Sequence, residues 1–216
     1  FDIANAASGL PISGPPGTLQ TATVTGLLPD THYYFAIKVL DNVNNASDIS
    51  NIVSTTTQPV QVLFFDDMES GASNWTVSGT LGPNGEPLWH LAGHRFNSPT
   101  TAFYGIDGVL NYNTGAANSG AMTSIPIDLL EATDASLSFR YFLRTENLSP
   151  YDAASVEISA DGGATWQQVF LTSLSTPGSG MVEEVIDISG FDGQLIQLRF
   201  SFATLDSAVN DFEGWV

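Results

Sequence analysis

The sequence contains no cysteine among its 216 residues. This absence excludes disulfide bonds, zinc sites built on thiolates and catalysis by a cysteine nucleophile. Long apolar runs are also missing, since no stretch approaches the roughly 18 consecutive apolar residues that suggest a membrane-spanning helix. We therefore predict no insertion into a membrane.

Basic residues are scarce: five Lys and Arg stand against 23 Asp and Glu, giving a formal net charge of −18. The five are scattered, as Lys38, Arg95, Arg140, Arg144 and Arg199. Nucleic acids and anionic lipid surfaces are both bound through clustered basic side chains, so we exclude the first as a partner and disfavour the second. The acidic excess suits divalent cations instead, above all Ca²⁺, which prefers carboxylate and carbonyl oxygens.

What the chain does have is apolar content and short-range alternation. Apolar residues make up 43% of the chain, enough for a buried core, and charged residues only 13%, a balance common in extracellular β-proteins. Period-two alternation recurs between turns rich in Gly, Pro and Asn, and long helical periodicity is absent. We predict strands at 21–25, 33–40, 49–56, 62–68, 75–77, 88–92, 102–105, 121–127, 135–143, 155–159, 166–170, 182–188, 194–203 and 213–216. So many short strands indicate an all-β chain of sandwich architecture.

A polar run at residues 54–58 ends in Pro59 and marks a domain boundary. We predict a first domain at 1–57, a linker at 58–61 and a second domain at 62–216.

The first domain contains the run Gly26-Leu27-Leu28-Pro29-Asp30-Thr31-His32-Tyr33. The run fits the pattern Leu-x-Pro-x-Thr-x-Tyr, and residues 18–57 resemble the C-terminal half of a fibronectin type III domain, an Ig-like sandwich. The resemblance implies that Tyr33 is a tyrosine corner, whose hydroxyl bonds to upstream backbone. It also implies about three of the usual seven strands. Their inner face would then be exposed or covered by a partner, and self-assembly through this half domain is one way to cover it.

The second domain contains four patches with a different resemblance. They are 64–71 with 74–76, 88–90 with 98–99 and 102–105, 151–152 with 156–159 and 161–166, and 198–200 with 214–216. Together they resemble the MAM-like jelly-roll domains of secreted bacterial immune inhibitor A-type metalloproteases and other exoproteases. The resemblance implies a jelly-roll β-sandwich that accompanies a catalytic domain. Because the family continues past the Gly214-Trp215 pair, we expect the last strand to be truncated.

One motif, Ser159-x-Asp161-x-Gly163-x-Thr165-Trp166, fits the Asp-box pattern. We predict a structural turn in which Asp161 accepts bonds from backbone amides, Gly162 and Gly163 supply permissive backbone angles, and Trp166 packs beneath. The alternative is a sialidase propeller, which would need repeated blades and repeated motifs, whereas this chain has one copy.

Acidic residues gather at both ends of the second domain: Asp66, Asp67 and Glu69 at its start, and Asp211 and Glu213 at its end. The first and last strands of a jelly roll commonly lie near each other. These five residues are therefore our predicted ligands for a structural Ca²⁺. The alternative is that they are simply solvated acids of an acidic protein.

Aromatic residues are the remaining binding candidates. Tyr112 and Tyr151 stand among Asn, Gly, Ser and Pro, which predicts exposed loops and a role in ligand binding. Trp89 and Trp166 are expected to pack in the core.

No catalytic motif is present. The pair His90 and His94 lacks the His-Glu-x-x-His pattern of zinc proteases, and no Gly-x-Ser-x-Gly elbow exists. A glycosidase pair such as Glu157 and Glu183 stays open, because chance acid pairs are expected in so acidic a chain.

We therefore predict a non-catalytic accessory or binding module pair of a secreted or cell-surface bacterial protein. Its role would be attachment, spacing or assembly, with a protein or polysaccharide surface as partner. Four alternatives remain: a carbohydrate-binding module, a structural subunit of a surface layer or filament, the non-catalytic C-terminal region of an extracellular protease, and a glycosidase.

Overall fold

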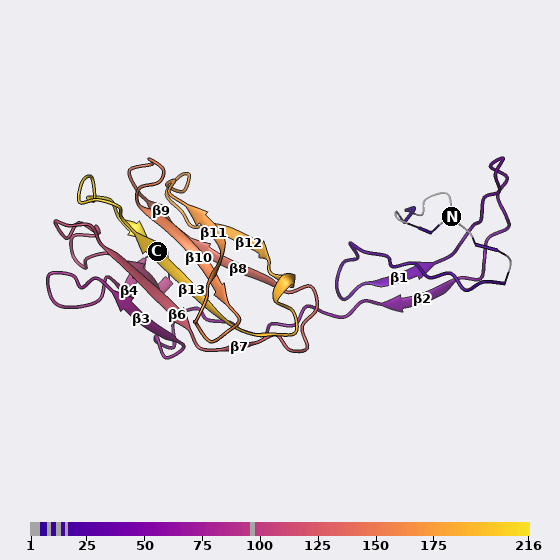
Figure 1. Ribbon diagram of the computed structural model, residues 1–216, viewed down its shortest axis with the longest axis horizontal. Helices are drawn as coiled ribbons and strands as arrows, with labels where there is room; N and C mark the ends of the chain where they lie inside the picture. The colour runs from indigo at the N-terminus through magenta and orange to yellow at the C-terminus, as the bar shows by residue number, and fades with distance from the viewer. Residues whose placement is uncertain (1–4, 8–9, 12–13, 16, 96–97) are drawn as a thin grey trace. The chain divides into compact units, whose positions relative to one another are not determined.

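The computed structural model describes the whole chain except residues 1–4, 8–9, 12–13, 16 and 96–97 (Figure 1). The side chains of residues 94, 95 and 98 also lie outside the described part, and with them the ring of His94. The chain divides into two compact units, Phe1–Val62 and Leu63–Val216, called unit 1 and unit 2 below. Strands dominate both units, and η1, a 3-10 turn at Ser189–Phe191, is the only helical element of the described residues. No helix there is long and apolar enough to cross a membrane. The all-β prediction is confirmed.

Unit 1 is built on two antiparallel strands, β1 (His32–Phe35) and β2 (Val53–Thr56). Both are shorter than predicted because serine hydroxyls interrupt the backbone ladder. The amide of Ile37 donates to Ser50 Oγ at 2.8 Å, and the amide of Val39 donates to Ser47 Oγ at 3.0 Å. Side chains of this kind compete with the carbonyl partners of a regular sheet.

None of the described residues of unit 1 is buried. Tyr33 and Phe35 are half-buried and lie 6.2 Å apart between ring centroids. The hydroxyl of Tyr33 accepts a hydrogen bond from the Leu28 amide at 2.8 Å, which is the backbone contact that the sequence predicts. The assignment of this unit to the fibronectin type III family stays a prediction.

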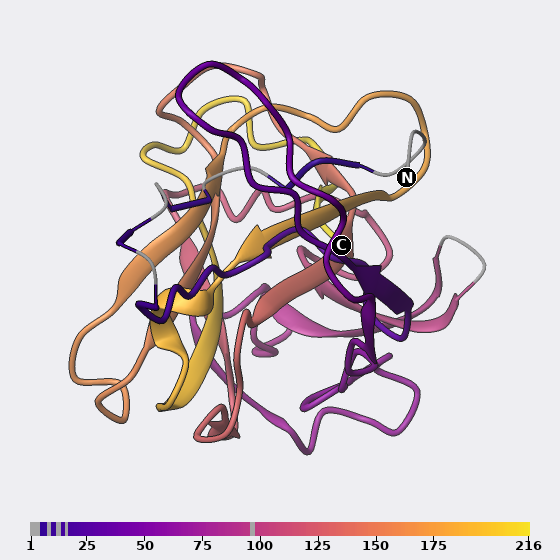
Figure 2. The same ribbon diagram turned by 90° about the vertical axis from the view of Figure 1, so that its right-hand side faces the viewer.

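Unit 2 is a β-sandwich, and its larger sheet has six strands in the order β11-β10-β13-β6-β3, with β7 pairing with β13 (Figures 1 and 2). The strands are β3 (Trp75–Gly79), β6 (Ser119–Ser124), β7 (Ile127–Asp128), β10 (Ala153–Ser159), β11 (Gln167–Thr172) and β13 (Leu195–Ala203). Every pairing is antiparallel.

Two smaller sheets lie against the larger one. The first has the order β4-β5-β14-β9 and the second pairs β12 with β8. Their strands are β4 (Trp89–Arg95), β5 (Ser98–Tyr104), β8 (Ser136–Tyr141), β9 (Leu143–Arg144), β12 (Val182–Asp187) and β14 (Gly214–Trp215). Phe142 joins β8 to β9 and exchanges two backbone hydrogen bonds of 2.9 Å with Val216.

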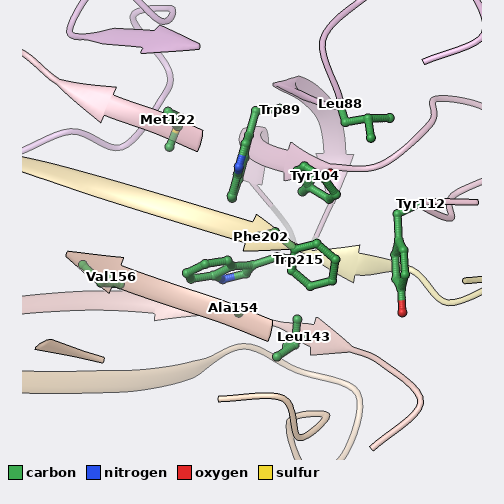
Figure 3. Packing of buried hydrophobic residues seen from close by; sticks show 10 residues of the cluster. All are labelled: Leu88, Trp89, Tyr104, Tyr112, Met122, Leu143, Ala154, Val156, Phe202 and Trp215. Atoms are coloured by element: carbon green, nitrogen blue, oxygen red, sulfur yellow. The ribbon is translucent and has the colours of Figure 1, made fainter. Parts of the chain in front are cut away.

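The core of unit 2 is formed by side chains from both layers (Figure 3). Trp89, Tyr104 and Trp215 come from the smaller sheets and meet Phe202 of β13. The rings of Tyr104 and Phe202 have centroids 4.7 Å apart, and those of Trp89 and Trp215 5.6 Å. Such aromatic packing buries large apolar areas and stabilises the sandwich. A second cluster contains Ile127, Leu129, Ile158, Ile188, Ile196 and Leu198.

Two predicted strands are wrong. Residues 21–25 and 62–68 form no strand in the structure. The alternation at 62–68 is real, because Phe64 and Met68 face the core clusters while Phe65 is 73% exposed. This segment makes no strand ladder, so its inward side chains pack without the backbone pairing that defines a strand.

Candidate functional site

One face of the six-stranded sheet points away from the core. Side chains alternate along β10 and β13, so Val156 and Leu198 are buried while Glu157 and Arg199 face outward. The strand register sets the outward residues in rows across the sheet. The two central rows are Glu157, Arg199, Thr123 and Thr76, and Ser155, Ser201, Ala121 and Ser78. This surface is called the polar face below.

A half-buried ion pair occupies the centre of the polar face. Arg199 Nε donates to Glu157 Oε2 at 2.7 Å, and Ser201 Oγ donates to the same oxygen at 3.1 Å. The Arg199 and Glu157 side chains keep 28% and 20% of their surface exposed. The other N–H groups of the guanidinium form no hydrogen bond within the described part of the chain. They are therefore donors available to a ligand.

Trp166 lies beside this pair, just before β11. The Arg199 guanidinium stacks 4.1 Å from the centroid of its indole, a cation–π contact. The indole Nε1 donates to the Gly163 carbonyl at 3.1 Å. Trp166 is half-buried rather than a core residue, contrary to prediction. Its position gives the polar face an aromatic ring at its edge.

The turn between β10 and β11 holds Trp166 in place. Asp161 accepts from the Thr165 amide at 2.9 Å, from the Thr165 hydroxyl at 2.6 Å and from the Ser159 hydroxyl at 2.7 Å. The hydrogen bonds from Thr165 and Ser159 lower the pKa of Asp161 to about 2. Gly162 and Gly163 have φ of 72° and 89°, in the left-handed region that favours glycine.

The polar face presents groups that can form hydrogen bonds and stacking contacts with a ligand. Its side chains on β6 and β3 are short and neutral, and its two central rows continue onto β11 with Gln168 and the exposed Leu171. Hydroxyl, guanidinium and carboxylate groups supply donors and acceptors, and the indole supplies a flat apolar surface. These features match a ligand rich in hydroxyl groups.

Tyr112 is a core residue, and the prediction that it lies exposed in a loop is wrong. Its side chain is 0% exposed, and its hydroxyl donates to Asp152 Oδ2 at 2.7 Å. Burial and the neighbouring Asp152 carboxylate raise the pKa of the Tyr112 phenol. The Asn- and Gly-rich context misled the prediction, because the loop is tied to others that close over the ring.

Tyr151 is half-buried next to Asp152. Its amide donates to the Leu148 carbonyl at 2.8 Å, which closes a turn before β10. Its role in ligand binding stays a prediction.

The predicted calcium ligands at the start of unit 2 serve local structure. Asp66 accepts from the Trp75 indole and from the Asn74 amide side chain, each at 2.9 Å. Asp67 Oδ1 accepts from the Glu69 amide at 3.1 Å. Asp66 therefore faces inward and anchors Trp75, whereas Asp67 is exposed.

The structure does not bring these acids to those at the end of the unit. Glu69 Oε1 accepts from the Thr100 amide at 3.2 Å, near the start of β5. Asp211 Oδ1 accepts from Asn113 Nδ2 at 2.8 Å, and Asn113 lies in the loop that follows β5. A strand of that length spans about 20 Å. Glu213 follows two residues after Asp211 and precedes β14. Within the described residues, no three His, Asp or Glu side chains form a group that could hold a metal ion.

The open catalytic alternatives find no supporting geometry. Glu157 is paired with Arg199 on the outer face of one layer, whereas Glu183 lies exposed on β12 of the opposite layer. They do not face each other across a cleft. His90 Nε2 lies 3.1 Å from Asp107 Oδ1, and His90 Nδ1 lies near backbone carbonyls. These contacts hold the imidazole ring in place.

Sequence reasoning missed Arg199 as a binding candidate. Its contact with Glu157 joins β13 to β10, and its contact with Trp166 reaches the turn before β11. Alternation along β13 did place Arg199 outward, and that was the available signal. The partner across the strands depends on register, which alternation alone does not give.

The chain has limited similarity to known proteins. No protein-family model matches it. Bacillopeptidase F of Bacillus subtilis (strain 168) is 28% identical over 168 residues, a match that covers 77% of this chain and 11% of that protein. The chain thus spans about a tenth of the length of the curated relative that it matches.

Two solved structures are also similar. A carbohydrate-binding module from the β-sandwich superfamily has a TM-score of 0.44 and 13% identity, over 86% of this chain and 70% of that one. The K2 cleaved adhesin domain of Lys-gingipain has a TM-score of 0.37 and 14% identity, over 62% of this chain and 88% of that one. Neither likeness is strong enough to assign a function.

Proposed function

We propose that the chain is a non-catalytic attachment module of an extracellular or cell-surface bacterial protein, and that unit 2 binds a polysaccharide through its polar face. The single observation that carries the proposal is the outward row centred on Arg199 and Glu157, flanked by Trp166. A hydroxyl-rich chain can exchange hydrogen bonds with the ion pair and stack on the indole. The similarity to part of a longer protein supports an accessory role, and the whole protein would be an exoprotease in that case.

The acidic character of the chain narrows the ligand class. With a net charge of −18, the protein repels anionic polymers over the distance of a Debye length, and Arg199 is already paired with Glu157. The polysaccharide should therefore be neutral.

The test is retention of the purified chain on cellulose, chitin and xylan. For each polymer that retains the chain, titration calorimetry with its soluble oligomers then measures the affinity. We expect Trp166→Ala and Arg199→Gln to weaken binding at least about tenfold, equivalent to about 1.4 kcal/mol. Glu183→Gln is the matched control, because Glu183 is exposed on the opposite layer. Absence of binding to every neutral polymer would contradict the function, while full binding by both variants would contradict the site.

A second candidate function rests on unit 1. Its exposed apolar side chains include Ile37 at 67%, Ile52 at 65% and Val53 at 55%. Association with a second copy, through pairing of the edges of β1 or β2 and packing of their exposed faces, would cover such residues and make the chain a subunit of an assembly. Sedimentation at high protein concentration tests this function, which fails if the chain remains a monomer.

A further inference from the structure

The Arg199 guanidinium is held in place from two directions. Its Nε donates to Glu157 Oε2 at 2.7 Å, between residues that are direct partners across β10 and β13. Its Cζ lies 4.1 Å from the centroid of the Trp166 indole, over the face of the ring. Because the guanidinium is fixed in both ways, a ligand that binds it does not have to order a free side chain.

Trp166 is fixed in turn by the backbone that precedes it. Its Nε1 donates to the Gly163 carbonyl at 3.1 Å, and the Gly163 amide donates to Ser159 Oγ at 2.8 Å. Ser159 Oγ donates to Asp161 Oδ1 at 2.7 Å. A continuous series of hydrogen bonds and one ring contact thus joins the turn to Arg199. Since the guanidinium covers one face of the indole, the ring acts on a ligand mainly through Arg199.

The ion pair keeps both donors and an acceptor available to a ligand. The terminal N–H groups of Arg199 and the Oε1 oxygen of Glu157 form no hydrogen bond with any other described residue. The two side chains keep 28% and 20% of their surface exposed. A guanidinium presents its N–H groups as a planar fork that fits two neighbouring acceptor atoms, whereas a carboxylate oxygen only accepts.

Two adjacent hydroxyl groups match this arrangement. A hydroxyl both accepts and donates, so both oxygens can accept from the Arg199 fork while one hydroxyl donates to Glu157. A carboxylate, sulfate or phosphate group would supply acceptors alone, and the Glu157 carboxylate would repel it. The chemistry of the pair therefore favours a neutral diol over an anion.

We propose that Arg199 and Glu157 recognise a vicinal diol of the bound polysaccharide, and that Trp166 is the positioning residue that orients the Arg199 fork. This inference rests on the proposed function and names the part of the ligand that the polar face recognises. Cellulose and xylan carry two adjacent free hydroxyls on each sugar, whereas in chitin an acetamido group replaces one of them. The chain should therefore bind cellulose or xylan in preference to chitin.

The diol is tested by titration calorimetry with cello-, xylo- and chito-oligomers of equal length. We expect the wild type to bind cello- or xylo-oligomers at least about tenfold more tightly than chito-oligomers, because a site built to bond a hydroxyl rejects an analogue that lacks it. Arg199→Lys keeps the charge and removes the fork, so it should lose this preference. Equal affinity of the wild type for cello- and chito-oligomers overturns diol recognition, as does a preference that Arg199→Lys retains.

The positioning role is tested with Trp166→Ala, Arg199→Gln and the variant that carries both changes. If the indole acts through Arg199, the double variant should bind within about threefold of Arg199→Gln alone, because the effects of coupled residues are not additive. Losses that multiply would mean that Trp166 contacts the ligand independently, and they overturn the positioning role.

A second readout needs no ligand. In the wild type the indole ring shifts the nuclear magnetic resonance of the Arg199 Nε proton, and Trp166→Ala should remove this shift. Trp166→Phe is the matched control, because it keeps a ring beneath the guanidinium and should retain most of the shift. An unchanged resonance in Trp166→Ala overturns the positioning role.

The outcomes separate this inference from the proposed function. Retention on none of the neutral polymers overturns both. Binding of cello- and chito-oligomers with equal affinity leaves the polysaccharide-binding function standing and overturns recognition of the diol alone.

Discussion

Units 1 and 2 use the same strand pattern with different results. In unit 1, alternation from Tyr33 leads to Ile37, which is 67% exposed. In unit 2, the alternation of β10 buries Val156 at 0% and Ile158 at 1%. Both strands carry apolar side chains on one face, Tyr33 and Phe35 in β1 and Ala154, Val156 and Ile158 in β10. The difference is that β10 has an opposing layer, whereas no described residue of unit 1 is buried.

The comparison shows that period-two alternation specifies a strand but does not bury it. A two-stranded hairpin is at best marginally stable in water, because it cannot bury enough apolar area. Burial of one large apolar side chain contributes about 1.5–3 kcal/mol, and that contribution requires a second layer. Unit 2 therefore has a buried core that can hold the side chains of a site in place. Unit 1 leaves its apolar side chains exposed.

The largest expected effect separates the core of unit 2 from the exposed strands of unit 1. Trp215→Ala removes a side chain that is 2% exposed at the centre of unit 2, and it should reduce the free energy of unfolding by about 3–5 kcal/mol. Tyr34→Ala in β1, where the ring is 72% exposed, should change it by less than about 0.5 kcal/mol. Urea denaturation followed by far-UV circular dichroism measures both, because all four tryptophans lie in unit 2 and their fluorescence would not report on unit 1. Similar losses for the two variants would break the comparison.

A smaller effect concerns the buried hydroxyl of Tyr112. Tyr112→Phe keeps the ring and removes the donor to Asp152, so a buried carboxylate loses a partner. We expect a loss of about 1–3 kcal/mol in unfolding free energy. Tyr33→Phe is the counterpart in unit 1, where the hydroxyl accepts from an exposed Leu28 amide, and it should have no measurable effect. Equal effects would mean that the tyrosine of unit 1 is also part of a packed core.

A pH-dependent effect is expected at the turn before Trp166. The pKa of Asp161 falls from 3.8 to about 2 in the folded state because its carboxylate accepts bonds from Thr165 and Ser159. A lowered pKa stabilises the fold above the unfolded value of 3.8, and this contribution is lost as the pH falls through about 2. Thermal unfolding of Asp161→Asn should therefore differ from wild type at pH 5 and converge with it near pH 2. A difference that does not change with pH would contradict the hydrogen-bonded carboxylate.

The smallest expected effect is the removal of unit 1. A chain of residues 63–216 should unfold at the same temperature as the whole chain in scanning calorimetry, because the core clusters contain only side chains of unit 2. A markedly lower unfolding temperature would show that unit 1 stabilises unit 2.

Much of the fold could be predicted from local sequence. The strands of unit 2 follow the alternation of apolar residues. The turn at 160–166 has glycines that tolerate a positive φ and an Asp that accepts hydrogen bonds from the turn. The segment at 62–68 alternates in the same way but forms no ladder, because pairing depends on a neighbouring strand that local sequence does not reveal. Tyr112 was placed in an exposed loop for the same reason, since polar neighbours do not tell which loops close over a side chain.

The candidate sites were harder to predict because they join distant positions. Glu157 and Arg199 meet only when β10 and β13 are in register. The acids at 66–69 and at 211–213 were grouped by an expected proximity of first and last strands. The structure separates Glu69 from Asp211 by the length of β5.

Hydrogen exchange of the whole chain, read residue by residue, tests the difference between the units most directly. Amides of β10 and β13 should exchange only through global unfolding, whereas amides of β1 and β2 should exchange orders of magnitude faster through local opening. That result would place both the stable fold and its candidate sites in unit 2. Equal protection of β1 and β13 would contradict the account, because it would require a packed core in unit 1.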